Sequence, residues 1–452
     1  MSQRQRASTR LPWMTVGLSA VLTVVPLTVF LTGGALTRQV VLAVAALLVA
    51  AYAATVHPLS IFVTLAAVLG FVPYLDVPGA NIPVLLVLAI GVWVALAFLP
   101  GVEFRPGGPE LWVLALAATA LLSVVATDLS VDSLTELAAW LVATAVVVPI
   151  RFLPLAARTL MIRTFVISAA AAATLGSALV RLDPDGSLLS KLTFAGYSQE
   201  RVRAQYVPGT EVIATRLTGT FVEPNIAGLV LAAAVMLAVA YFQGPMRVVL
   251  VVLIGGGLLL TLSRTALATV VVAGVVLVLR AGGRRRLALI ASGVVAGLGA
   301  LAIPNVRGRL LDSFGPSDTG SIERDRALEA FPEAMEGHWI WGLGWAREEF
   351  RDASLSATVN YVANGPLMTI YRGGVILGIL SVLALVVLVV RSWIAAKRSF
   401  EDAVVCGAVI GFVLMALQLD FPIVLQTPAT IVFSFVVGLS LVPHPPPRSI
   451  DA

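Results

Sequence analysis

Two arginines, Arg216 and Arg264, are the residues of this chain whose type and spacing point most directly to chemistry. They enclose two apolar runs, 225–242 and 248–262, in the segment RLTGTFVEPNIAGLVLAAAVMLAVAYFQGPMRVVLVVLIGGGLLLTLSR. Two consecutive membrane spans would return the chain to its starting side, so we expect both guanidinium groups at one membrane surface. A planar guanidinium matches the oxygens of phosphate, which makes phosphate the expected ligand.

The residues beside the two arginines also favour an anion. Gly219 permits a tight turn, and Pro224 suits the first turn of a helix whose start favours negative charge. Ser263 and Thr265 place a hydroxyl on each side of Arg264. The alternative for Arg216 is an ordinary interfacial arginine whose side chain extends to the lipid headgroups. The alternative for Arg264 is a position at the tip of a short hairpin outside the membrane.

Three further arginines are candidates for the same anion. Arg324 and Arg326 lie in the polar segment SIERDRALEAF, and Arg372 interrupts a later apolar run. An arginine inside an apolar run must pair, reach water or line a cavity. Salt bridges with neighbouring acidic residues are the alternative role for the first two.

The candidates for catalysis are His338, Glu223 and Asn364. His338 is the only histidine in the two long polar segments described below, and histidine titrates near neutral pH. Glu223 is a competing base whose alternative role is to pair with Arg216. Asn364 stands at the start of the apolar run that contains Arg372.

Membrane spans must position these residues. Of the 452 residues, 59% are hydrophobic and 12% are charged, whereas a soluble domain has about 25% charged residues. We expect an all-α integral membrane protein, with residues 1–452 as a single polytopic domain, because apolar runs long enough to span a bilayer recur. About 12–14 transmembrane helices are predicted, at roughly 12–32, 39–56, 59–75, 81–99, 109–126, 134–150, 160–180, 224–242, 246–262, 264–280, 286–303, 365–390, 402–418 and 424–442.

Basic clusters at short loops set the expected orientation. The clusters near residues 4–10, 151–163, 280–286 and 391–398 predict that both termini are cytoplasmic. Two long polar segments then lie outside, a first extracytoplasmic loop at 182–223 and a large one at 304–364. We therefore expect a multi-pass protein of the cytoplasmic (inner) membrane with its site on the extracytoplasmic side. The excess of Lys and Arg over Asp and Glu is explained by membrane topology, so we expect no nucleic-acid partner.

The large loop contains SIERDRALEAFPEAMEGHWIWGLGW. Its first part has the pattern of an amphipathic helix, with Ile322, Leu328 and Phe331 along one side. The tryptophans near its end, Trp341 and Trp345, predict either an interfacial belt or surfaces that stack on sugar rings.

The chain lacks the sequence motifs of several other enzyme classes. The chain contains no phosphate-binding glycine loop and no zinc-protease pattern, so we expect neither a cofactor nor a metal. Cys406 is the only cysteine, which excludes an intrachain disulfide, and its apolar surroundings predict a buried small hydrophobe.

Four elements, in this order, resemble the bacterial O-antigen ligase/polymerase superfamily. They are RLTGTFVEPN, TLSRTA, SIERDRALEAFPEAMEGHWIWGLGW and VANGPLMTIYRGGVILG, which together cover about 216–378. The resemblance implies a metal-independent, inverting glycosyl transfer at the outer face. The donor would be a glycan on undecaprenyl diphosphate, the acceptor a sugar hydroxyl, and arginines matching Arg216 and Arg264 hold the diphosphate in such proteins.

One position departs from the family pattern. In the ligases a histidine precedes the asparagine that matches Asn364, and this chain has Ala363 there. The departure weakens the likeness to a lipid-A-core ligase in particular, and His338 is a possible substitute from the large loop.

A transporter or flippase of lipid-linked oligosaccharide is the alternative function. It also needs cations for a diphosphate, but along a central path, and transporters often contain two matching halves. Here the arginines and the large loop gather at one face, which favours an enzyme. A purely structural scaffold would leave Arg264 and Arg372 unexplained.

Overall fold

A computed structural model describes residues 52–77, 82–100, 102, 106–184, 186–197, 216–312, 319–347, 364–417 and 427–442, without the side chains of 309–312 and 319–326. Helices dominate this part of the chain, and no β-strand occurs in it. The α-helices are α3 (Pro58–Phe71), α4 (Val84–Phe98), α5 (Gly108–Thr127), α6 (Val131–Ala145), α7 (Val147–Arg151), α8 (Leu155–Leu182), α9 (Pro224–Tyr241), α10 (Gly244–Leu260), α11 (Arg264–Arg280), α12 (Gly283–Leu301), α13 (Pro304–Asp312), α14 (Thr319–Ala334), α15 (Gly365–Ala395), α16 (Phe400–Ala416) and α17 (Thr427–Ser440).

Five helical segments are long and apolar enough to cross a membrane. They are α5, the pair α6–α7, α8, α9 and α15, and four shorter apolar helices accompany them, namely α3, α4, α10 and α17. Length and composition thus agree with the expected all-α membrane protein. Every predicted span from 59–75 onward falls on one of the helices, whereas 12–32 and nearly all of 39–56 lie outside the described residues. The total of 12–14 spans stays a prediction.

Prolines set several helix boundaries. α3 ends at Phe71, before Pro73, and α4 begins at Val84, directly after Pro83. Proline lacks the N–H that a helix interior requires and restricts the residue before it. At the start of α9, Pro224 occupies the first helical position, where no N–H is needed.

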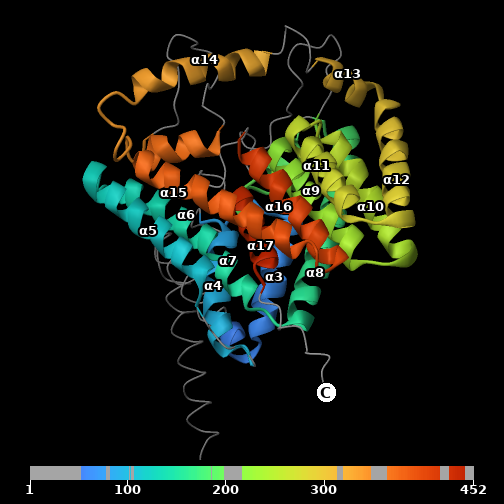
Figure 1. Ribbon diagram of the computed structural model, residues 1–452, viewed down its shortest axis with the longest axis horizontal. Helices are drawn as coiled ribbons and strands as arrows, with labels where there is room; N and C mark the ends of the chain where they lie inside the picture. Colours follow the sequence, from blue (N-terminus) through green and yellow to red (C-terminus); the bar gives the residue numbers. More distant parts are fainter. Residues whose placement is uncertain are drawn as a thin grey trace, which may run out of the picture.

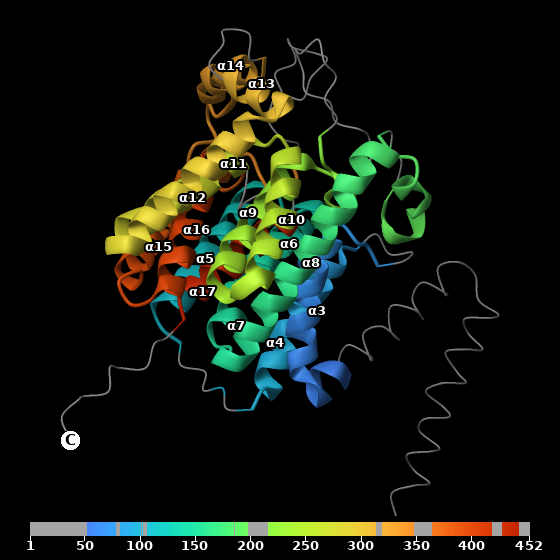
Figure 2. The same cartoon turned by 90° about the vertical axis from the view of Figure 1, so that its right-hand side faces the viewer.

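The centre of the bundle is α9. Nearly all of its side chains are buried, apart from Asn225 and the last turn, and α8, α10, α11, α16 and α17 pack around it (Figures 1 and 2). A helix that is apolar on every side must be surrounded by protein or lipid. Small residues allow close approach, because a Cβ added to Gly228 of α9 would lie 2.6 Å from the Cβ of Ala266 in α11.

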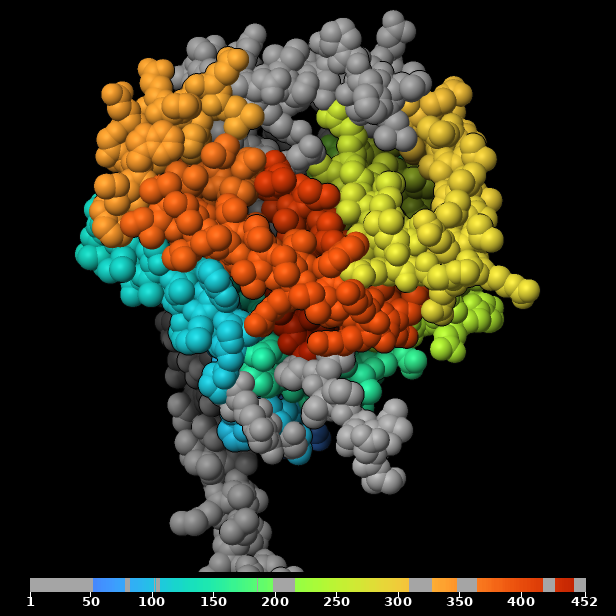
Figure 3. All heavy atoms as spheres, viewed as in Figure 1, coloured from blue at the N-terminus to red at the C-terminus, as the bar shows by residue number. Residues whose placement is uncertain are grey.

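Helix α15 is broken at Gly374, where the backbone leaves the helical region with φ 81° and ψ 172°. The segment after α14 fills the break: the Val375 N–H donates to the Trp339 carbonyl at 2.8 Å, and the Leu343 N–H donates to the Tyr371 carbonyl at 2.7 Å. α15 crosses one face of the molecule, between α5 and the α12–α13 region (Figure 3).

Helices α13 and α14 lie across one end of the bundle, above the other helices in both ribbon views. α14 and the turn after it contact the first half of α15: Ala327, Phe331 and Met335 form one apolar cluster with Met368 and Tyr371.

The sequence pattern misplaced the buried side of α14. Leu328 was expected to face inward with Phe331, but it is 43% exposed. Ala327 is buried against α15 instead, so the buried face of α14 is turned by one residue from the expected one. Ile322 belongs to the part of α14 whose side chains are outside the description.

Candidate functional site

Arg216 is held against the connection between α10 and α11. Its Nε donates to the Thr261 carbonyl at 2.9 Å, and its Nη2 donates to Asn225 Oδ1 at 3.1 Å. The next residue is fixed in the same way, because the Leu217 N–H donates to the Leu260 carbonyl at 2.9 Å. The two ends of the segment singled out in the sequence therefore meet in space.

Asn225 links the first turns of two helices. Its Oδ1 also accepts a hydrogen bond from Ser263 Oγ at 3.2 Å, and Ser263 is the residue before α11. Ser263 Oγ lies 3.2 Å from Thr265 Oγ1 as well. The Ser263 hydroxyl thus bridges α9 and α11, and α11 has no side-chain N-cap hydrogen bond.

We call Arg216, Asn225, Ser263 and Arg264 the paired-helix site. Two helix N-termini, each of which carries a partial positive charge, meet there beside the Arg216 guanidinium, and Arg264 is the first residue of α11. Ser263 is 1% exposed, whereas Arg216 and Arg264 are half-buried. Fixed positive charge at a partly dry surface favours a bound anion.

Backbone strain flanks the same site. Val222 has φ 61° and Leu262 has φ 52°, and within the described residues these are the two non-glycine residues with positive φ. One lies two residues before α9 and the other two residues before α11. Left-handed backbone is unfavourable for such side chains and persists only where the surroundings hold it, often at functional sites. Neither residue type signals this conformation, so sequence reasoning missed it.

A small cavity adjoins Arg216 on the side of α8. Residues at the end of α8, in the following turn and in 216–219 line it, among them Asp183, Gly186, Arg216 and Gly219. Burial opposes ionisation of Asp183, but the Leu188 N–H and the Ser187 hydroxyl donate to its carboxylate, so its pKa lies below the ordinary value.

The 3₁₀ turn Gly219–Phe221 connects this region to α9. Gly219 has φ 49°, so the expected tight turn is confirmed. The Tyr197 hydroxyl donates to the Thr220 carbonyl at 3.0 Å, and the Thr220 hydroxyl donates to the Phe71 carbonyl. Burial raises the pKa of Tyr197, which therefore stays a neutral donor. These bonds fix the approach of the chain to the paired-helix site.

Glu223 lies directly before α9, and its side chain is half-buried. It therefore stands next to the paired-helix site, and its role as a base stays a prediction.

Asn364 caps α15. Its Oδ1 accepts from the Leu367 N–H at 3.1 Å, and its Nδ2 donates to the Leu417 carbonyl at the end of α16 at 3.1 Å. Both functional atoms of the side chain thus have a structural partner. A direct catalytic role for Asn364 stays a prediction that must compete with this capping role.

The packing of α11 on α16 shows where this cap lies. A Cβ at Gly411 would be 2.5 Å from Thr269 Cγ2, and one at Gly407 would be 2.9 Å from Ala273 Cα. This antiparallel register brings the end of α16, at Leu417, to the level of the start of α11. Asn364 and the paired-helix site therefore lie at the same end of the bundle.

Helix α13 covers part of that end, because Val306 packs against Leu262 in one apolar cluster. The opposite end holds arginines that were predicted to be cytoplasmic. Arg280 Nη2 donates to the Trp393 carbonyl at 2.8 Å, and Arg151 Nε donates to the Leu441 carbonyl at 3.0 Å. The two groups of arginines thus occupy different ends of one bundle.

Arg372 is buried, with 2% of its surface exposed, directly before the break in α15. Its carbonyl accepts from Ser123 Oγ of α5 at 3.3 Å, and Glu136 of α6 lies within electrostatic range of its guanidinium. A role for Arg372 in binding a diphosphate stays a prediction, and the proposed function does not rest on it.

The large-loop candidates have different outcomes. His338 lies in the turn after α14 and is exposed, and its backbone bonds to Met335 and Gly342. The side chains of Arg324 and Arg326 lie outside the description, as do residues 348–363, which include Ala363.

The tryptophans have separate roles. Trp345 is 1% exposed and packs on Trp140 of α6 with ring centroids 5.1 Å apart, so the interfacial belt and the sugar platform are both wrong for it. Trp341 is 38% exposed, and its carbonyl accepts from Ser123 Oγ at 2.9 Å.

No protein-family model matches the chain, and no curated protein matches it.

Proposed function

We propose that the chain is a membrane glycosyltransferase that transfers or polymerises a glycan from an undecaprenyl-diphosphate carrier onto a sugar acceptor. The reaction would take place at the outer face of the cytoplasmic membrane. This is the function that the sequence resemblance implies, and the paired-helix site supports it. A diphosphate needs several fixed positive groups close to lipid.

The observation that carries the proposal is the joint fixation of Arg216 by α9 and by the α10–α11 connection. Hydrogen bonds to Thr261 and Asn225 hold the guanidinium in one place, and Ser263 ties the start of α11 to the same asparagine. Arg264 is the first residue of α11. Groups fixed in advance stabilise developing charge without reorganising during the reaction.

The proposed reaction needs little chemistry beyond charge stabilisation. A hydroxyl oxygen of the acceptor sugar attacks the anomeric carbon of the donor and forms the new glycosidic bond. The bond from that carbon to the diphosphate oxygen breaks, its electron pair stays on the undecaprenyl diphosphate, and the hydroxyl proton passes to a base. Glu223, beside the site, and His338, on the exposed turn, are the candidate bases.

The test uses a strain that lacks the gene, complemented with the wild type, Arg216→Ala or Arg264→Ala. Lipid-linked glycans are extracted and sized by mass spectrometry, and an impermeant label reports their sidedness. We expect wild-type polymer or transfer product to be restored only by the wild-type gene, with each variant present in the membrane at the wild-type level. Normal product from either variant would refute the role of the two arginines.

The accumulated intermediate in the deletion strain distinguishes the possible functions. Single repeat units on the outer face indicate a polymerase, and long chains retained on the lipid there indicate a ligase. Units trapped on the cytoplasmic face would instead support the flippase.

A further inference from the structure

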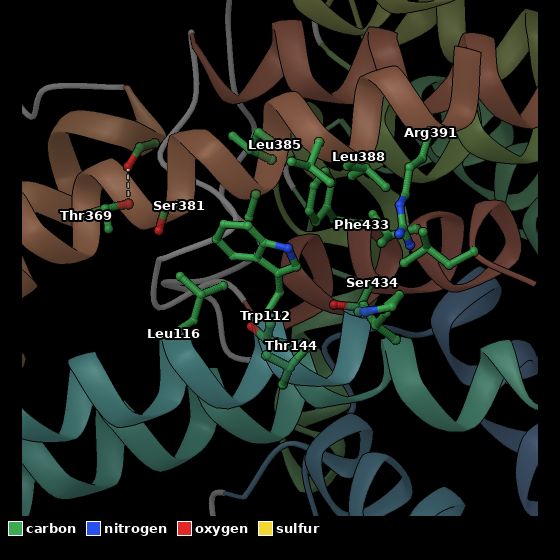
Figure 4. Close-up of a pocket in the computed structure, with 18 of the residues that line it drawn as sticks. Trp112, Leu116, Thr144, Thr369, Ser381, Leu385, Leu388, Arg391, Phe433 and Ser434 are labelled. Carbon is green, nitrogen blue, oxygen red and sulfur yellow. Dashed lines mark hydrogen bonds between the residues drawn. The ribbon is translucent and has the colours of Figure 1, made fainter. Parts of the chain in front are cut away.

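A second feature of the bundle, a cleft between α5, α6–α7, α15 and α17, is separate from the paired-helix site. Its walls are apolar, and Trp112 of α5 stands in the middle, facing Leu385 and Leu388 of α15 (Figure 4). A partly open apolar cleft between helices suits a hydrocarbon chain.

Three hydroxyl groups interrupt the apolar walls. Thr144 Oγ1, Ser381 Oγ and Ser434 Oγ line the cleft, and each is buried without a hydrogen-bond partner among the described residues. Ser434 is 1% exposed. A hydroxyl in a membrane helix ordinarily bonds to the carbonyl four residues earlier, as Thr369 does to Gly365 at 2.7 Å in the same cleft. Unpaired buried hydroxyls are therefore available to polar atoms of a ligand.

One end of the cleft is cationic. Arg391 reaches from α15 toward Ser434 at this end (Figure 4), and its side chain lies near the start of α5, where a Cβ at Gly108 would be 3.6 Å from Nη2. Within the described part of the chain Arg391 has no acidic partner. Its neighbour Arg151 differs, because it pairs with Glu110 and bonds to the Leu441 carbonyl.

This cationic end is not the paired-helix site. Arg391 lies two residues before Trp393, whose carbonyl holds Arg280, so it belongs to the end of the bundle opposite Arg216 and Arg264. An anion bound at Arg391 would therefore be a different group from the proposed diphosphate.

We propose that this cleft binds a membrane lipid with a phosphate headgroup. Its hydrocarbon chain lies along Trp112, Leu385 and Leu388, and its phosphate lies on Arg391. The hydroxyl of Ser434 donates to an ester or phosphate oxygen beside it. The occupant is a phosphate lipid because the apolar walls around Trp112, Leu385 and Leu388 lead, at one end of the cleft, to the Ser434 hydroxyl and the cation Arg391. The inference does not depend on the proposed transferase activity.

The test is native mass spectrometry of the purified protein with three probes. These are dioleoyl phosphatidylglycerol, undecaprenyl phosphate and, as a control without phosphate, dioleoylglycerol. We expect both phosphate lipids to bind the wild type and Arg391→Gln to weaken both by about tenfold, the loss of one charge-assisted contact. Tighter binding of phosphatidylglycerol identifies a phospholipid site, and tighter binding of undecaprenyl phosphate identifies a prenyl phosphate site.

Two further variants keep the test decisive. Ala384→Trp places an indole in the cleft and should reduce binding of both phosphate lipids, whereas Arg398→Gln removes an exposed arginine outside the cleft and should change nothing. The proposal is overturned if Arg391→Gln binds as the wild type does, if Arg398→Gln weakens binding equally, or if dioleoylglycerol binds as tightly as phosphatidylglycerol.

Discussion

Replacing Asn225 with aspartate separates an anion site from a merely structural contact. Asn225 Oδ1 accepts from Arg216 and from Ser263. A carboxylate at the same position can accept both hydrogen bonds and adds an ion pair with Arg216. If the cluster only stabilises the fold, Asn225→Asp should be as stable as the wild type and as active. If the cluster binds a diphosphate, the new negative charge should repel the substrate while the fold is retained.

The size of the effect follows from the geometry. Asn225 Oδ1 lies 3.1 Å from Arg216 Nη2. An anion on the outer edge of that guanidinium would be on the order of 5 Å from the new carboxylate, and two unit charges at that separation repel by about 3 kcal/mol at an effective dielectric constant of about 20. Each 1.4 kcal/mol changes a rate by about tenfold, so we expect kcat/KM to fall by about 100-fold.

The assay uses lipid-linked glycan extracted from the deletion strain and measures product formed by membranes with matched amounts of each variant. Thermal unfolding of the purified proteins reports the fold. Gln243→Asp is the matched control, because it adds the same charge at an exposed residue before α10, a helix that begins where α9 ends. Wild-type kcat/KM in Asn225→Asp, with the fold intact, would refute the anion site.

Two further predictions concern the parts that support the site. Gly374→Ala should lower the free energy of unfolding by about 2–4 kcal/mol, because a Cβ there would be 1.9 Å from the Ile340 carbonyl oxygen at φ 81°. The control is Gly255→Ala, since a Cβ at Gly255 would have no neighbour within 4 Å. Equal melting temperatures for the two variants would contradict the packing of 339–343 on α15. Hydrogen bonds hold the pKa of Asp183 below its ordinary value of 3.8, so the ionised carboxylate stabilises the fold above that pH, and this contribution is lost as the pH falls through the folded-state pKa. In acid titrations followed by limited proteolysis, Asp183→Asn should lose this part of the pH dependence of stability. A pH profile identical to that of the wild type would contradict the role of Asp183.

The sequence predicted the helices well because long apolar runs and prolines are local signals. Pro83 and Pro224 mark helix starts, and every predicted span within the described residues falls on a helix. The meeting of Arg216 with the α10–α11 connection was also predictable, because two successive spans return a chain to the same side. Asn225 carried a readable signal, a polar side chain in the first turn of an apolar helix, but no role was assigned to it.

Features that depend on distant partners were not predictable in the same way. Glu136 lies in electrostatic range of Arg372, and Trp345 packs on Trp140, although each pair is far apart in the sequence. The buried side of α14 is set by its contact with α15, where Ala327 is buried and Leu328 is exposed. The strained backbone at Val222 and Leu262 leaves no mark on residue type.

The central claim is that the chain cleaves the bond between a glycan and undecaprenyl diphosphate. The most direct measurement incubates the purified protein in nanodiscs with lipid-linked glycan from the deletion strain and quantifies free undecaprenyl diphosphate together with the elongated or transferred glycan. We predict one undecaprenyl diphosphate for every new glycosidic bond with the wild type, and neither product with Arg216→Ala or Arg264→Ala. Product without release of undecaprenyl diphosphate, or equal release by the variants, would contradict the account.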